Sequence, residues 1–219
     1  PGLTKPAEVK LDGEVVKVRV PKTLSEERIH ALLQQKSPWI RKKLREMRLA
    51  APIKPKEYVS GETFCYLGKN YRLKIVSGEE SPIKLKRGYL QATIPDGAGA
   101  TKDKAVKSLL TVWYTAHAGK KLVEKTKRYA KILDVSYKSV SVRYYKSRWG
   151  SCSRNGEISY NWRLIMAPHR IVDYVVVHEL CHLLEHSHSP RYWRYVEAVI
   201  PDFRDCRKWL REHSQRLEI

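Results

Sequence analysis

His178-Glu179-Leu180-Cys181-His182 is the stretch of this 219-residue sequence that most restricts its fold and chemistry. On a helix, side chains four positions apart lie on the same face, so both imidazoles can reach one metal ion at about 2.0–2.1 Å. Glu179 follows the first histidine and is placed to take a proton from a water molecule at the metal. The motif therefore predicts one Zn²⁺ per chain, with Glu179 as the catalytic base.

The residues before this motif indicate that its helix is buried. Residues 172–177 read VDYVVV and are largely apolar, and Pro168 stands where the first turn of a helix over residues 168–186 accepts it. Two histidines and a glutamate on a buried helix are costly without a ligand, and a metal ion supplies one. A chance meeting of two histidines near a glutamate is the alternative interpretation.

A catalytic zinc takes three protein ligands and keeps a fourth position open. His186, His188, Glu185 and Glu197 are the candidates for the third ligand. His186 would lie a full turn too far along a continuing helix. His188 lies six residues after His182, which is the metzincin spacing, although Glu185 stands where the metzincin turn has glycine. We expect His188 to be the ligand, with Glu197 from the next helix as the alternative.

The rest of the chain predicts an α+β fold in two parts: a mostly-β N-terminal unit with one helical insertion, residues 1–98, and a catalytic domain, residues 99–219. Alternating apolar residues around Asp12-Gly13 indicate a hairpin, and Ser25 begins a helix that Pro38 kinks or divides. Strands are expected at residues 63–67, 71–76, 83–86, 89–94, 140–145 and 157–162, and helices at residues 102–133, 168–186, 190–199 and 203–218. The segment around residues 149–152 is expected to be a loop.

The charge of the chain is strongly positive, with 43 Lys and Arg against 23 Asp and Glu and a net charge of +20. Such an excess attracts polyanions, so nucleic acid, nucleotides or an acidic membrane surface are candidate partners. A generally basic surface is the plainer explanation. The second half of the 102–133 helix is rich in lysine, and it forms either a solvated outer face or a surface that contacts phosphates.

Features that would indicate export or a membrane span are missing from the sequence. No window approaches about 18 consecutive apolar residues, and the first residues lack the apolar core of a signal peptide. The four cysteines contain no CxxC pair. We therefore expect free thiols in a reducing compartment and a cytoplasmic protein.

Several motifs together resemble the YgjP-like (DUF45) metallopeptidase family, which is grouped with SprT-like and WLM proteases. They are Arg148-Trp149-Gly150-Ser151-Cys152, Asn161-Trp162-Arg163-Leu164, residues 174–182, and His188-Ser189 with Tyr192-Trp193, and further similarities upstream extend the resemblance over nearly the whole chain. The resemblance implies that His178, His182 and His188 bind zinc, that Glu179 is the base, and that the catalytic domain is a minimal zincin with its active-site helix under a small mixed sheet. Ser187 and Tyr192 replace the commoner Asn and Phe, and neither change removes a ligand.

Residues around the motif suggest how a substrate binds. If the 157–162 strand is the sheet edge beside the metal, an extended peptide can add to it as a further strand, whereas a plain interior strand explains the same pattern. Cys152 is either a structural thiol or a group close to the metal. Trp149 and Trp193 are expected to pack around the site, and Arg148 is a candidate for holding an anionic group.

These observations predict a zinc-dependent metallopeptidase that acts on a peptide or protein substrate. Two alternatives remain open at this point. One is a metal-dependent nucleotide or phosphoanhydride hydrolase, because the basic surface attracts phosphates and a metal-activated water can also attack phosphorus. The other is a nucleic-acid-associated protease that uses the basic residues 120–131 to reach its target.

Overall fold

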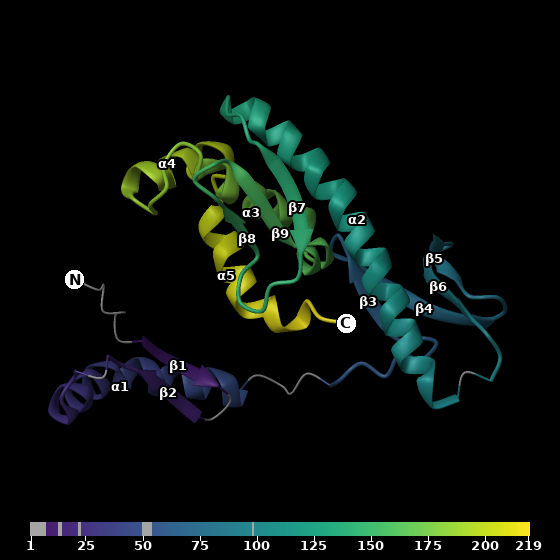
Figure 1. Cartoon of the computed structure of the whole chain (residues 1–219), viewed down its shortest axis with the longest axis horizontal. Coiled ribbons are helices and arrows are strands. Elements are labelled where there is room, and N and C mark those ends of the chain that lie inside the picture. Colours follow the sequence, from purple (N-terminus) through teal and green to yellow (C-terminus); the bar gives the residue numbers. More distant parts are fainter. Residues whose placement is uncertain (1–7, 13–14, 22, 50–53, 98) are drawn as a thin grey trace. The chain divides into compact units, whose positions relative to one another are not determined.

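The computed structural model describes residues 8–12, 15–21, 23–49, 54–97 and 99–219, and the chain divides between residues 54 and 55 into two units (Figure 1). In the first unit, β1 (Glu8–Asp12) pairs antiparallel with β2 (Val15–Arg19), and α1 spans Glu26–Leu49. The predicted turn at Asp12-Gly13 lies partly outside the described residues. Helix α1 continues through Pro38 instead of being divided there.

The second unit begins at Pro55, whereas the division expected from the sequence is at residue 98, and this unit contains the two larger of the three sheets that the described residues form. Strands β3 (Thr63–Tyr66), β4 (Lys69–Ser77), β5 (Ser81–Lys86) and β6 (Tyr89–Ile94) form a sheet of order β3-β4-β6-β5, in which β4 and β6 are parallel. Within residues 1–54, the described part holds two five-residue strands and one 24-residue helix, so helix outweighs strand there.

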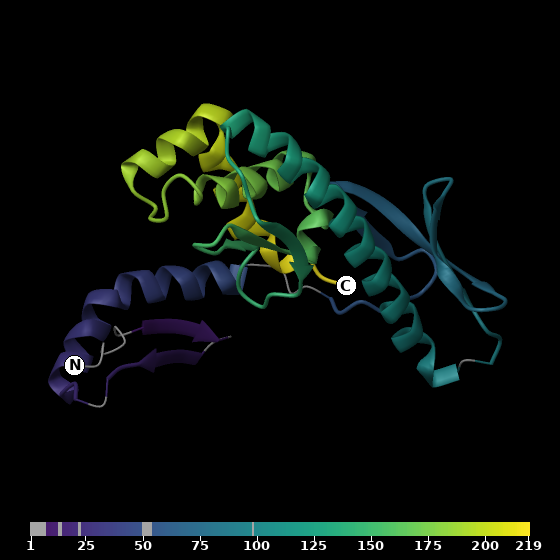
Figure 2. The same ribbon diagram turned by 45° about the horizontal axis from the view of Figure 1, so that its top comes forward.

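Helix α2 (Lys102–Leu133) is the element that joins the two sheets into one unit. It follows the short helix η1 (Gly99–Thr101) and contacts β5 and β6, and farther along it contacts β7 and α3 (Figure 2). The β3–β4 turn adds a second link, because Leu67 N–H donates to the Ile165 carbonyl at 2.8 Å. A Cβ at Gly68 would lie 2.8 Å from Pro168 Cα, so this contact requires glycine.

The second sheet lies beside the candidate metal centre. Its strands are β7 (Ser139–Arg143), β8 (Gly150–Cys152) and β9 (Glu157–Asn161), in the order β7-β9-β8. The expected loop at residues 149–152 is therefore largely a strand, and β9 is the central strand instead of the edge. Each side of β9 is paired, parallel to β7 and antiparallel to β8. This double pairing explains why Ser159 and Asn161 are buried along with their apolar neighbours.

The remaining elements are helical. They are η2 (Trp162–Met166), α3 (His169–Cys181), α4 (Pro190–Val199), α5 (Phe203–His213) and η3 (Ser214–Arg216). Helix α3 ends at Cys181, earlier than expected, and its valines are almost completely buried. A partly buried ion pair of 2.6 Å between Lys125 Nζ and Asp173 Oδ1 ties α2 to α3. The apolar run before the histidine motif therefore does carry its helix into the core.

The state of the cysteines and the apolar character of the helices were also considered from the sequence. All four cysteines are free. Among the described residues, no helix combines the length and apolar character that a bilayer crossing requires.

Candidate metal centre

The end of α3 and the loop after it bring three histidines together. His178 lies in the last turn of α3, and His182 follows the helix directly. His188 comes from the loop that leads into α4, where the Ser189 side chain caps the helix by accepting from Tyr192 N–H at 3.2 Å. Pro190 occupies the first turn of α4, a position where its missing N–H leaves no bond unmade. This abrupt helix start turns the chain back toward α3.

The three imidazoles form a compact donor set. One ligand atom from each ring lies within 4.8 Å of the others, and Nε2 of His178 is 3.2 Å from Nε2 of His188. Two nitrogens bound tetrahedrally to zinc at 2.0–2.1 Å are about 3.3 Å apart. The 3.2 Å between His178 and His188 is therefore the spacing of two ligands on one metal ion, and His182 is close enough to provide a third donor.

The other candidates for the third ligand are engaged elsewhere. Glu197 forms an ion pair of 2.6 Å with Arg204, and the Glu185 carboxylate accepts from the backbone and hydroxyl of Ser187. His186 is exposed. Within the described part of the chain, the group of side chains that could hold a metal consists of His178, His182 and His188.

Glu179 follows His178 on α3, and its side chain is buried against the edge strand β8. Its side chain is so close to Gly150 of β8 that a Cβ at residue 150 would lie 2.5 Å from Glu179 Oε1. Burial raises the pKa of Glu179 to about 8, and the positive charge of Arg148 acts in the opposite direction. The absence of a side chain at residue 150 is what leaves room for this carboxylate beside the edge strand.

The electrostatics of the triad favour neutral imidazoles. Burial lowers the pKa of His178 to about 3, and repulsion from His182 and His188 adds to the effect. Burial also lowers the pKa of His182 and of His188. A metal binds the neutral ring, so this environment keeps the nitrogens ready to coordinate at neutral pH.

Aromatic side chains of α4 hold the histidines in place. The Tyr192 hydroxyl donates to the His178 carbonyl at 2.8 Å, and its ring stacks on His182 with 4.7 Å between centroids. Trp193 stacks on His188 at 5.4 Å, as expected for a residue that packs around the site. The role of Tyr192 was missed from the sequence, because a hydroxyl near a histidine motif gives no signal before the helices are placed.

Cys152 does not join the histidines. It is half-buried, and its Sγ donates to the Ser153 carbonyl at 3.5 Å. Burial raises the pKa of this thiol to about 11, with the charge of Glu179 adding to the effect. Burial and the nearby Glu179 thus favour the neutral thiol, and the donor group formed by His178, His182 and His188 does not include Cys152.

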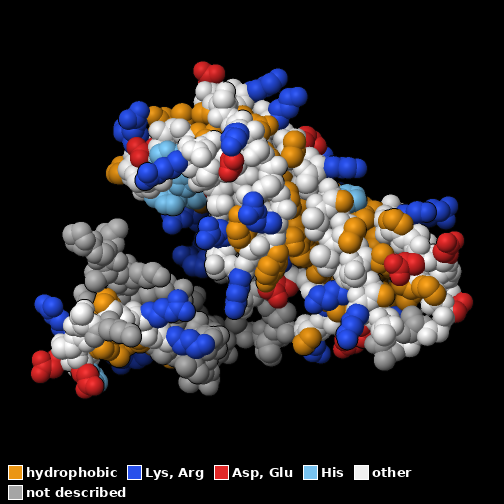
Figure 3. All heavy atoms as spheres, in the orientation of Figure 1, with side chains coloured by type: hydrophobic (Ala, Val, Ile, Leu, Met, Phe, Trp, Pro, Cys, Tyr) orange, Lys and Arg blue, Asp and Glu red, His pale blue; other side chains and the backbone are white. Residues whose placement is uncertain are grey.

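The space-filling view in Figure 3 shows histidine side chains gathered on an open face near α4, with Lys and Arg side chains close by. A solvent-accessible histidine triad beside a buried glutamate is the arrangement of a metallohydrolase.

Comparison with known proteins identifies the family. The YgjP-like metallopeptidase domain matches residues 5–213, and the chain belongs to this family. Among solved structures, the chain is similar to the metallopeptidase zymogen abylysin of Pyrococcus abyssi, with 23% identity over 41% of this chain and 93% of that one and a TM-score of 0.36. No curated protein sequence matches significantly. The family match gives no support for a nucleic-acid partner.

Proposed function

We propose that this protein is a zinc-dependent metallopeptidase in which His178, His182 and His188 bind one Zn²⁺ and Glu179 is the general base. The observation that carries the proposal is the set of three imidazole nitrogens within 4.8 Å of one another, next to the buried Glu179. Imidazole donors suit zinc, and three protein ligands with one open position are typical of catalytic zinc. When bound, the ion would polarise the scissile carbonyl and make water at the open position more acidic.

Glu179 performs the proton transfers in this proposal. Burial alone favours the protonated acid, and the positive charge of a bound metal ion would favour the ionised carboxylate. That carboxylate accepts a proton from the attacking water and later delivers a proton to the leaving amine. The carboxylate is held between α3 and Gly150, where few solvent molecules compete for its lone pairs. A fixed, shielded base of this kind contributes about 10²- to 10⁴-fold to the rate.

The free edge of β8 supports a peptide as the substrate. Strand β8 pairs with β9 on one side, and its other side has no strand partner among the described residues. An extended peptide can add there and form main-chain hydrogen bonds, which fix its position without requiring a particular sequence. The sheet edge that would receive the peptide is thus β8, not the 157–162 strand considered from the sequence.

The decisive experiment compares Glu179→Gln with Glu197→Gln. Zinc content is measured by mass spectrometry, and turnover is measured with casein and with a fluorogenic peptide library. Glu179→Gln should keep about one zinc per chain and lose about 10²- to 10⁴-fold in turnover. Glu197→Gln should change neither quantity, since the Glu197 carboxylate is paired with Arg204. Loss of zinc from Glu197→Gln would mean that Glu197 is a metal ligand. Full activity of Glu179→Gln would mean that Glu179 is not the general base.

The second candidate function is hydrolysis of a nucleotide or another phosphoanhydride by the same centre. The net charge of +20 favours it, because such a surface concentrates polyphosphates. Assaying nucleoside triphosphates beside casein, with Glu179→Gln in both assays, separates the two. Turnover of the triphosphate alone would replace the peptidase proposal.

A further inference from the structure

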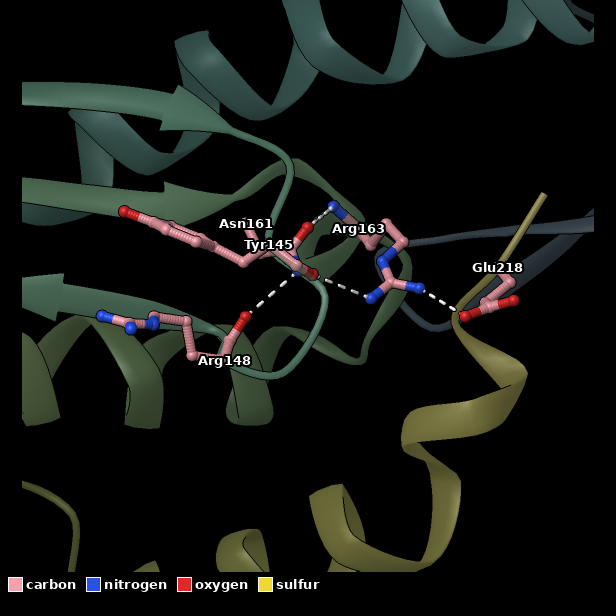
Figure 4. Close-up of polar contacts among 5 residues, drawn as sticks. All are labelled: Tyr145, Arg148, Asn161, Arg163 and Glu218. Atoms are coloured by element: carbon pink, nitrogen blue, oxygen red, sulfur yellow. Dashed lines mark hydrogen bonds and ion pairs between the residues drawn. The ribbon is translucent and has the colours of Figure 1, made fainter. Parts of the chain in front are cut away.

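A cationic cavity of about 390 Å³ lies between the loop that precedes β8 and the C-terminal segment, residues 210–218. Lys146 and Trp149 line it from the loop, Arg163 from η2, and Arg211 and Glu218 from the C-terminal segment. Arg148 also belongs to its wall, although the Arg148 side chain extends away from Arg163 (Figure 4). The cavity wall therefore carries an excess of positive charge, with Glu218 as its carboxylate.

Arg163 is the most firmly held cation of this wall. Its side chain is 9% exposed, and its Nη2 donates to the Tyr145 carbonyl at 3.1 Å. The guanidinium lies over the rings of Tyr144 and Trp149, at 5.0 and 5.6 Å from their centroids. Its Nε is buried and has no hydrogen-bond partner among the described residues. A buried arginine with an unmade hydrogen bond is poorly explained by stability alone, because each such donor is destabilising.

Glu218 is bound to Arg163 but is itself loosely held. Its carboxylate accepts from Arg163 Nη1 at 2.5 Å (Figure 4), while its side chain is 63% exposed. An exposed carboxylate leaves an ion pair at little cost, whereas a buried guanidinium without an anion is strongly unfavourable. The cavity is thus suited to exchange one carboxylate for another.

The cavity lies along the same sheet as the candidate metal centre. Tyr160 pairs with Gly150, the residue beside Glu179, and Arg163 follows three positions later. Three residues of an extended chain span at most about 10 Å. The buried Asn161 fixes the loop between β7 and β8, because its Nδ2 donates to the carbonyls of Tyr145 at 2.8 Å and Arg148 at 3.1 Å. A peptide paired with β8 would therefore bring to the cavity a residue about three positions away from the one that lies beside Gly150.

We propose that this cavity is a carboxylate-binding subsite for the peptide substrate, in which Arg163 holds an acidic side chain of the peptide and Glu218 occupies the subsite when no substrate is present. The inference rests on the proposed peptidase function and names its substrate class, peptides with an acidic group near the scissile bond. Because Glu218 competes with the substrate, its removal should improve binding of acidic peptides.

Peptide binding to the intact chain tests this subsite without any need for turnover. The probes are fluorescein-labelled, alanine-rich octapeptides in which one Glu is stepped through the positions, each with a Gln counterpart. Fluorescence anisotropy is measured on the Glu179→Gln protein at physiological ionic strength, where general attraction to the basic surface is screened. The variants are Glu218→Gln and Arg163→Met, and Lys131→Met removes an equal charge from the exposed end of α2 as a control.

At one Glu position, Kd should be about tenfold lower than for the Gln peptide, as for one additional charge-assisted hydrogen bond. Glu218→Gln should lower the Kd of that peptide further. Arg163→Met should make the Kd values of the Glu and Gln peptides equal, and Lys131→Met should keep the ratio of these two values.

If Arg163→Met does not fold, Glu218→Gln still decides the question. Unchanged or weaker binding by Glu218→Gln would show that the pair only fastens the C-terminal segment, and equal Kd values at every position would also overturn the subsite. Tighter acidic-peptide binding by a protein that cleaves no peptide would retain the subsite and discard the peptidase function.

Discussion

Gly150→Ala tests whether the position of Glu179 against the edge strand matters for catalysis. The new Cβ would lie 2.5 Å from Glu179 Oε1, 2.7 Å from Cγ and 2.8 Å from Cδ, whereas ordinary contacts begin at 3.4 Å. The carboxylate must therefore retreat by about 0.9 Å, and a misplacement of about 1 Å can cost 10²-fold in rate. We expect kcat/KM to fall by about 10²-fold, which corresponds to ~2.7 kcal/mol. Overpacking should lower the free energy of unfolding by about 1–3 kcal/mol.

The assay measures kcat/KM on a fluorogenic peptide, zinc content, and the free energy of unfolding by urea. Gly119→Ala is the matched control, because a Cβ at this helical position meets nothing within 4 Å. It should leave kcat/KM unchanged and stabilise the protein by about 0.5–1 kcal/mol. A folded, zinc-loaded Gly150→Ala protein with wild-type kcat/KM would refute the assignment of Glu179 as a closely positioned base. Zinc loss from this variant would instead locate the damage at the histidines.

Three further predictions concern the support of the site and its metal. Tyr192→Phe removes the hydroxyl that donates to the His178 carbonyl, so zinc affinity, measured by chelator competition, should fall by about tenfold; an unchanged affinity would contradict this supporting role. Lys125→Met removes the ammonium partner of the partly buried Asp173, and urea unfolding should show a loss of about 3 kcal/mol, while a loss below about 1 kcal/mol would mean that the pair behaves as a surface pair. Removing zinc with a chelator should destabilise the protein by about 4 kcal/mol relative to a solution with free zinc at 1,000 times Kd, and equal stability with and without zinc would argue against a bound ion.

Local signals in the sequence predicted the helices and most strands well. Helix α2 spans residues 102–133 as its apolar stripe indicated, and α4 begins at Pro190 because proline and a capping serine specify a helix start. The strand β8 was predicted as a loop, because three residues containing glycine carry too little alternation to be recognised. The helix after Pro168 was predicted too long for a related reason: no proline or glycine marks its end at Cys181.

The sequence by itself determined the chemistry that the site can offer. The spacing of His178 and His182 predicts two of the donors side by side, and the family follows from motifs read in order along the chain. Such information is local, because a helix fixes the relative directions of residues four apart.

Only the tertiary structure decided which distant residues complete the site. His188 meets His178, Gly150 lies against Glu179, and Glu218 reaches Arg163 across 55 positions. The spacing from His182 favoured His188 over its competitors, whereas the contacts of Gly150 and Glu218 do not follow from spacing, because they depend on how α3, β8 and the C-terminal segment pack around a shared core. Burial also belongs to this level: the pKa of Glu179 and the fixed orientation of Arg163 arise from neighbours that the fold supplies.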